Sequence, residues 1–385
     1  MRRMPLGLLR QDAIWPGMAH PLLIGSNIYR GSTYGRLHPL SIPRVPTVLD
    51  LSRALGWLPR AQYRTSPMAK PAALARFHTT DYLAALRRAE TQQSVAQSVR
   101  DRHGLGTLSN PIFAEMYRRP ATAVGGGFLA AELVADGGCV FNPGGGTHHG
   151  FPDRAAGFCY LNEPVLTILR LLEMGVDRVA YVDIDAHHGD GVEAAFVGSE
   201  RVRVISVHEA RRWPFTGAET ETAKGAAVNL PVPRGFNDSE FQMLLHEVIL
   251  PAVDGFRPQA IFLQCGADAV AEDPLSRLCL SNQSHWSAVA ALQGLSSRFI
   301  VSGGGGYNPW TVGRLWTGVW GVMNGCDMPD HLPEPARTIQ GQLSWTRKAR
   351  PAPALLTTLA DSPRHGPIHD DVRSLAGRMK TRRWS

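Results

Sequence analysis

The chain repeats one pattern of hydrophobic and polar positions: an amphipathic stretch, a short loop, an apolar run, and a loop rich in glycine and polar residues. Apolar residues spaced three and four apart predict helices, and short uninterrupted apolar runs predict buried strands. The predicted helices cover 121–135, 164–174, 239–253 and 284–295. Each is followed by a predicted strand, at 139–141, 179–182, 260–265 and 299–301.

This alternation indicates an α/β fold. Continuous apolar strands separated by helices are typical of a parallel sheet that is covered on both faces. Ligands of such open sheets bind beyond the carboxyl ends of the strands. The four polar loops leave those ends, so we expect them to meet at one edge. No linker or change of composition divides residues 20–330, which predicts a single domain.

Composition narrows the class of protein further. Of the 385 residues, 44% are hydrophobic, enough for a large core, but no apolar run reaches the roughly 18 residues of a membrane span. The basic segment 1–17 lacks the apolar stretch of a secretory signal. The five cysteines are odd in number and scattered, which favours reduced thiols and a cytoplasmic location.

The formal charge of +7 is concentrated at the C-terminus. Residues 1–336 carry 30 charged side chains of each sign, so the body of the chain is neutral. We therefore expect no specific nucleic-acid partner, and we expect the basic, proline-containing segment 336–385 to be a peripheral or partly disordered arm.

The most informative segment is VDIDAHHGDG, residues 182–191, which places Asp183, Asp185, His187, His188 and Asp190 directly after an apolar run. Burying a carboxylate without a partner is costly, so such a cluster usually binds a metal or forms charged pairs. On an extended chain, Asp185 and His187 point the same way and supply two donors of an open zinc-type site. A salt-bridged loop is the alternative interpretation.

A third ligand is expected from another loop at the same edge. Asp268 follows the strand 260–265 by one short turn and is the best candidate. Asp273 is its competitor, although it precedes a proline and lies further from the strand end.

Two further loops carry candidates for acid–base chemistry. His148 and His149 follow three glycines, and Asp183 and Asp190 can pair with them to tune two imidazoles for amide hydrolysis. Tyr307 emerges from a glycine run and can donate to a developing oxyanion. A glycine-rich loop can also cradle phosphate, but the spacings of nucleotide-binding motifs are absent.

Taken together, the loops resemble the histone deacetylase family of the arginase–deacetylase superfamily, over roughly residues 20–325, and look most like bacterial class II-like, acetoin-utilisation-type members. The motifs that carry the resemblance are GGGTHHG (144–150), GFCYLNE (157–163), VDIDAHHGDG (182–191), QCGADAVAEDP (264–274) and GGGGYNPW (303–310). The resemblance implies a three-layer α/β sandwich around an open, mostly parallel sheet of about eight strands. It also implies a zinc-dependent deacetylase domain at 1–335.

The resemblance assigns roles to individual residues. It implies Zn²⁺, with Fe²⁺ as the alternative, held by Asp185, His187 and Asp268. It implies His148 and His149 as the acid–base pair, with Asp183 and Asp190 as their partners, and Tyr307 as the electrophile. Structural K⁺ is expected near Asp183, Asp185 and Ser206. The substrate would contact Gly157, Phe158, Trp213, Leu275 and Gly305, and Arg44 would lie in an internal acetate channel.

Two departures from the family matter. The family's rim aspartate aligns with Ser109, which puts the anchoring of a peptide substrate in doubt. The chain after residue 335 matches nothing in the family.

The leading hypothesis is a metal-dependent amidohydrolase that removes acetyl or short acyl groups from lysine side chains of proteins. An amidohydrolase of acetylpolyamines or other small acetylated amines is the alternative, favoured if acidic residues surround the pocket mouth. An arginase-like enzyme with two manganese ions would need further bridging carboxylates. A binding protein for acyl-lysine without turnover is the non-enzymatic alternative. The oligomeric state is open, and a homo-oligomer is among the options.

Overall fold

The structure is a computed structural model that describes residues 20–346 and 350–382. Within these ranges the chain forms one open sheet of eight strands in the order β2-β1-β3-β8-β7-β4-β5-β6, with every neighbouring pair parallel. The strands are β1 (Leu22–Gly25), β2 (Tyr63–Thr65), β3 (Gly138–Asn142), β4 (Val179–Asp183), β5 (Val202–Glu209), β6 (Ala227–Val232), β7 (Ala260–Gln264) and β8 (Arg298–Ser302). The predicted α/β fold with a parallel sheet is confirmed.

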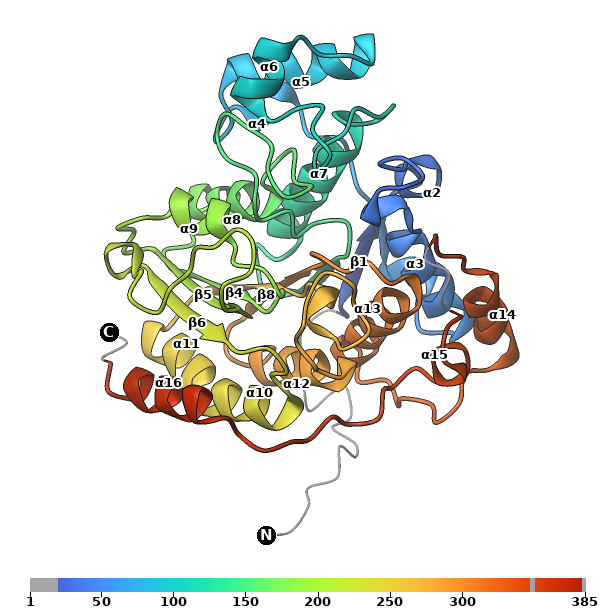
Figure 1. Ribbon diagram of the computed structural model, residues 1–385, viewed down its shortest axis with the longest axis vertical. Helices are drawn as coiled ribbons and strands as arrows, with labels where there is room; N and C mark the ends of the chain where they lie inside the picture. The colour runs from blue at the N-terminus through green and yellow to red at the C-terminus, as the bar shows by residue number, and fades with distance from the viewer. Residues whose placement is uncertain (1–19, 347–349, 383–385) are drawn as a thin grey trace.

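Helices cover both faces of the sheet (Figure 1). One face packs against α7, α8 and α9, and the other against α3, α10, α11, α12, α13 and α16. The helices are α2 (Ile28–Gly31), α3 (Arg44–Ala54), α4 (Pro71–Leu74), α5 (Thr80–Gln92), α6 (Gln97–His103), α7 (Arg118–Leu133), α8 (Glu163–Glu173), α9 (Asp190–Ala195), α10 (Asp238–Leu244), α11 (Leu250–Phe256), α12 (Asn282–Leu292), α13 (Pro309–Met323), α14 (Glu334–Gln342), α15 (Pro353–Thr357) and α16 (Asp370–Lys380).

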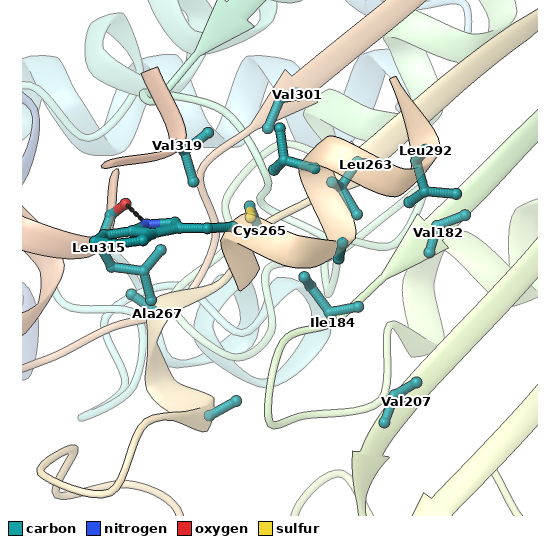
Figure 2. Packing of buried hydrophobic residues seen from close by; sticks show 14 of the residues in the cluster. Val182, Ile184, Val207, Leu263, Cys265, Ala267, Leu292, Val301, Leu315 and Val319 are labelled. Atoms are coloured by element: carbon teal, nitrogen blue, oxygen red, sulfur yellow. Dashed lines mark hydrogen bonds between the residues drawn. The ribbon is translucent and has the colours of Figure 1, made fainter. Parts of the chain in front are cut away.

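The alternation of side chains along each strand supplies both apolar layers. In β7, Ile261 and Leu263 face the α12–α13 side, whereas Phe262 faces α7 and α8. Figure 2 shows Leu263 grouped with Leu292 of α12 and Val319 of α13. Because strands buried on both faces need apolar residues at every position, they form the continuous apolar runs seen in the sequence.

One predicted helix is interrupted. The pattern over 239–253 predicts a continuous helix, but the structure has α10 and α11 joined by a π-helical turn, Leu245–Ile249. Pro251 lies in the first turn of α11 and has no N–H to donate to the preceding turn. The wider turn accommodates that missing donor, and a π-turn inside a helix is the usual form of such an insertion.

A separate layer stands above the carboxyl edge of the sheet. Helices α4, α5 and α6 form the upper part of the molecule in Figure 1. Their apolar cluster includes Tyr82, Phe113 and Tyr160 and extends to Tyr307 in the loop after β8. The hydroxyl of Tyr82 donates to the carbonyl of Tyr160 at 2.5 Å, which ties α5 to the GFCYLNE loop. This layer therefore forms one wall of the edge where the polar loops meet.

The C-terminal segment, which we expected to be a peripheral or partly disordered arm, packs against the domain through helix α16. Helix α16 buries Val372, Leu375, Ala376 and Met379 in the same core as α10 and α11. The spacing of these residues makes one apolar face, which the segment's high charge obscured. The boundary at residue 335 stays a prediction. Segment 1–17 and Arg383 of the terminal basic cluster lie outside the described residues.

Among the helices of the described residues, none combines the length and apolar character that crossing a membrane requires.

The docking of α16 predicts opposite effects for two substitutions in one helix. Met379 is fully buried, so Met379→Ala should lower the free energy of unfolding by about 2–5 kcal/mol. Gly377 is exposed, and a Cβ there would meet no atom within 4 Å. Gly377→Ala should therefore raise stability by about 0.5–1 kcal/mol through helix propensity. Denaturant unfolding of both variants measures this, and a Met379→Ala protein as stable as the parent would contradict the docking.

Candidate active site

Three buried side chains at the carboxyl edge form a set of metal donors. Asp185 and His187 follow β4, and Asp268 lies on the short helical turn after β7, the strand paired with β4. The His187 Nδ1 atom lies 3.2 Å from Asp185 Oδ1 and 3.0 Å from Asp268 Oδ2. One ligand atom from each residue lies within 4.8 Å of the others. The structure thus brings the three predicted ligands together, and Asp268 rather than Asp273 completes the set.

The surrounding donors fix both carboxylates in place. Asp185 Oδ2 accepts from the Gly305 N–H at 2.7 Å and from Gln264 Nε2 at 2.9 Å. Asp268 Oδ1 accepts from the Ala186 N–H at 2.9 Å. Burial raises the pKa of Asp268, and the nearby charge of Asp185 raises it further. A bound cation would relieve this repulsion, so the donor set fits a divalent metal.

Two His–Asp pairs lie beside the donor set. His148 Nδ1 lies 2.7 Å from Asp183 Oδ2, and His149 Nδ1 lies 2.7 Å from Asp190 Oδ1. The two imidazole rings are 4.0 Å apart between centroids. A second donor, the hydroxyl of Tyr181, also reaches Asp183 Oδ2 at 2.7 Å. The structure therefore forms both predicted pairs and leaves Nε2 of each histidine available.

The two histidines have different pKa values because their surroundings differ. Burial lowers the pKa of His148, but the charges of Asp183 and Asp185 outweigh it and raise that pKa to about 9. Burial and the charge of His148 lower the pKa of His149 to about 4, although the hydrogen bond that His149 donates to Asp190 acts in the opposite direction. The pair thus holds one charged and one neutral imidazole near neutral pH.

A cavity of about 400 Å³ leads from the surface to this edge. Seven predicted site residues line it: His149, Gly157, Phe158, His187, Trp213, Leu275 and Tyr307. The Trp213 indole is 4.6 Å from the His149 ring between centroids. A Cβ on Gly157, where φ is +50°, would lie 2.3 Å from Trp213. Glycine is therefore required for the wall to close around the cavity.

Other predicted residues lie behind the cavity. Gly305 is not among its lining residues, because its N–H binds Asp185 from the protein side. Arg44 is half-buried beneath the glycine loop and donates to the Gly304 carbonyl at 2.5 Å. Ser206 lies opposite Asp183 in the β4–β5 pair. The acetate-channel and potassium roles stay predictions. His188 bonds Thr216 at 2.8 Å, outside the cavity.

Three residues position the site in ways that the sequence does not predict. Asp273 accepts from the N–H groups of Tyr307 at 2.7 Å and Leu275 at 2.9 Å, so it joins two cavity loops. Asn110 Oδ1 accepts from the Phe158 N–H at 3.0 Å. Gln264 ends β7 and binds Asp185. Gln264 could have been identified, because it is a polar residue at the end of an apolar strand. The partners of Asp273 and Asn110 lie far away in the sequence, so no local pattern indicates their hydrogen bonds.

This fold and site define the class of arginase/deacetylase-like α/β proteins. Residues 38–323 match the family described as Histone deacetylase domain. The chain is 35% identical to histone deacetylase 9 of Arabidopsis thaliana, over 79% of this chain and 73% of that protein. It is 32% identical to the acetoin utilization protein AcuC of Bacillus subtilis (strain 168), over 82% of this chain and 85% of that protein.

Solved structures agree with the sequence matches. The structure of an HDAC homologue from Aquifex aeolicus aligns with a TM-score of 0.90 at 34% identity, covering 94% of this chain and all of that one. A structure of an HDAC homologue complexed with SAHA aligns at 0.87 and 33% identity with the same coverage. The chain belongs to the histone deacetylase family. Membership supports deacetylase activity, which is a hydrolase reaction.

The close approach of Gly305 predicts a variant that cannot hold the metal. A Cβ at Gly305 would lie 2.0 Å from Asp268 Oδ2, so Gly305→Ala must displace a ligand. We expect the variant to retain only a small fraction of the divalent metal that the parent retains, measured by elemental analysis after dialysis against the same metal solution. Gly294→Ala is the control, because a Cβ there meets nothing within 4 Å. A Gly305→Ala protein that retains as much metal as the parent would contradict the assigned donor set.

Proposed function

We propose that this protein hydrolyses the amide of acyl-lysine side chains in a metal-dependent reaction, with acetyl as the first acyl group to test. One observation carries the proposal: His149 and His187, the histidine of the Asp185–His187–Asp268 donor set, line the same cavity. The deacetylase activity of the family supports the reaction type. The structure of a homologue complexed with SAHA supports ligand binding by a protein of this fold.

The three donors would hold the metal. When bound, a divalent ion acts as a Lewis acid that polarises a carbonyl and lowers the pKa of water. Zinc suits one imidazole and two carboxylates that leave coordination positions open. Fe²⁺ instead of zinc, and structural K⁺ near Ser206, stay predictions.

His149 is the residue placed to move protons. Its Nδ1 is engaged by Asp190, which leaves Nε2 as the atom that faces the cavity. In the proposed reaction, Nε2 takes a proton from the attacking water as oxygen bonds to the carbonyl carbon. The C–N bond then breaks, and the proton passes to the departing amine, giving acetate and lysine. His148 does not line the cavity, and its ring lies 4.0 Å from the His149 ring between centroids, where its charge lowers the pKa of His149.

Tyr307 is the residue placed to bind the carbonyl oxygen. Its side chain lines the cavity and meets Phe158 edge-on, with ring centroids 5.6 Å apart. Burial, together with the charge of Asp268, raises the pKa of Tyr307 well above its usual range. The phenol therefore keeps its proton and can donate a hydrogen bond as the oxygen becomes negative.

The cavity wall suits the methylene chain of a lysine. Phe158, Trp213 and Leu275 surround the passage with apolar groups, and such walls favour an extended aliphatic stem over a polar chain. The mouth does not favour a polyamine, because its only carboxylate among the described residues that line the cavity, Glu209, is buried against Arg212. A cytoplasmic location and a homo-oligomer stay predictions, the former supported by five free cysteines.

Removing one hydroxyl tests the proposed reaction. Tyr307→Phe should bind zinc as the parent does but lose about 100-fold or more in kcat on an acetyl-lysine peptide, because one oxyanion donor is gone. Acetate release and zinc content measure the two effects. Tyr63→Phe, at a half-buried position on β2, is the matched control and should keep full activity. A Tyr307→Phe enzyme with near-normal kcat would overturn the assignment.

A further inference from the structure

The mouth of the cavity is basic. Three arginines line it, Arg211, Arg212 and Arg234, against one carboxylate, Glu209. The Glu209 side chain is buried, and the Arg212 guanidinium binds both of its oxygens. The N–H of Arg277 also donates to Glu209 Oε2 at 2.8 Å. Glu209 is therefore fully engaged, and its single negative charge is shared between Arg212, which binds both oxygens, and the more distant Arg234.

The other two arginines give the mouth a net positive charge. Among the described residues, Arg211 is exposed and its side chain has no hydrogen bond or ion pair. The side chain of Arg234 is 79% exposed and approaches Glu209 Oε1 only to 3.7 Å. The rim residue Ser109, where the family has an aspartate, adds no negative charge. Two guanidinium groups thus face whatever enters the cavity.

The pairing of β5 with β6 brings the segments that carry these two arginines to the same end of the sheet. Glu209 and Val232 are partners in the parallel β5–β6 pair, and the Ala210 N–H extends the pair by bonding the Val232 carbonyl at 2.8 Å. Arg211 and Arg234 each follow that last pair by two residues. Both residues lie in the turns that leave the strand ends, and both line the cavity mouth. Two positive charges at one mouth favour an anionic group there.

A second hollow, of about 580 Å³, adjoins the mouth and is lined by the same two arginines. Glu219 and Asp371 also line it, and Arg378 binds both oxygens of Glu219, at 2.7 and 2.5 Å. This hollow is therefore mixed in charge, whereas the positive excess belongs to the boundary between the two hollows. A substrate whose acyl group reaches the cavity end passes that boundary with the atoms next to its lysine.

We propose that Arg211 and Arg234 select substrates that carry a carboxylate next to the acylated lysine. This inference rests on the proposed function for the reaction but concerns recognition at the mouth. An acidic side chain one position away in a peptide, or the α-carboxylate of a free acyl-lysine, supplies the same chemistry. A polycationic acetylated amine would be repelled.

The test compares acetyl-lysine peptides that differ only in their flanking residues. With the zinc-loaded full chain, we expect kcat/KM to rise about 3- to 10-fold from Gln to Glu flanks and to fall with Lys flanks or acetylspermidine. The preference should shrink at high salt, because exposed charges are screened. Free Nε-acetyl-lysine and its amide distinguish the two sources of the carboxylate, and a preference for the free acid also supports the inference.

Variants assign the preference to the two arginines. The double substitution Arg211→Gln and Arg234→Gln should bring the Glu-to-Gln ratio close to one, and substitution of both by Glu should favour the Lys-flanked peptide. Lysine at both positions should retain the preference for Glu. Arg88→Gln, an exposed arginine on α5 away from the cavity, is the control and should keep both rate and ratio.

Peptide affinity, measured by fluorescence anisotropy on the same proteins, separates failure of the inference from failure of the proposed reaction. If Glu- and Gln-flanked peptides are turned over with equal rates and bind with equal affinities, the inference is rejected and the proposed reaction is retained. Tighter binding of the acidic peptide without turnover of any peptide supports recognition of the carboxylate at the mouth and rejects the proposed reaction. A Glu preference that survives the double Gln substitution also rejects the inference.

Discussion

The alternation of side chains at the end of β4 is the constraint on which the site depends. Asp183, Asp185 and His187 point to the carboxyl edge, while Ile184 and Ala186 between them are buried in the apolar core below. Figure 2 shows Ile184 beside Val182 in that core. A shift by one residue would exchange the two sets. It would bury carboxylates in an apolar layer at a cost of several kcal/mol each, so core packing holds the ligands in register.

The buried carboxylates in turn dictate how the other loops approach. Each oxygen needs a donor, and main-chain N–H groups supply it only where the backbone comes close. Gly305 reaches Asp185, and Ala186 reaches Asp268. The space that a Cβ would fill at Gly305 is taken by Asp268 itself. The glycine run after β8 thus allows a main-chain N–H to bind a buried carboxylate, and the same run positions Tyr307 at the cavity.

The sequence predicts those features that a short segment determines. The helix–strand alternation, the ligand pair on β4 and the histidine pair after β3 all follow from local spacing. The contacts that position Tyr307 do not, because Asp273 lies 34 residues away from it. The basic mouth was not predicted either, although its arginines are present in the sequence. The segments that carry Arg211 and Arg234 come to the same end of the sheet only through the pairing of β5 with β6, and the apolar pattern had not identified either strand.

The C-terminal helix links the overall fold to the mouth of the cavity. Arg378 binds Glu219, and Arg382 donates to the Glu219 carbonyl at 3.2 Å. Glu219 belongs to the loop after β5, which also carries Arg211 and Trp213. Exposed ion pairs contribute little individually, so the apolar face of α16 must provide most of the attachment. The C-terminal segment therefore packs beside the loop that carries Trp213 of the cavity wall and Arg211 of the mouth. The sheet fixes the metal donors and the His–Asp pairs. The proposed substrate recognition depends instead on exposed side chains, Arg211 and Arg234, which can change without disturbing the core.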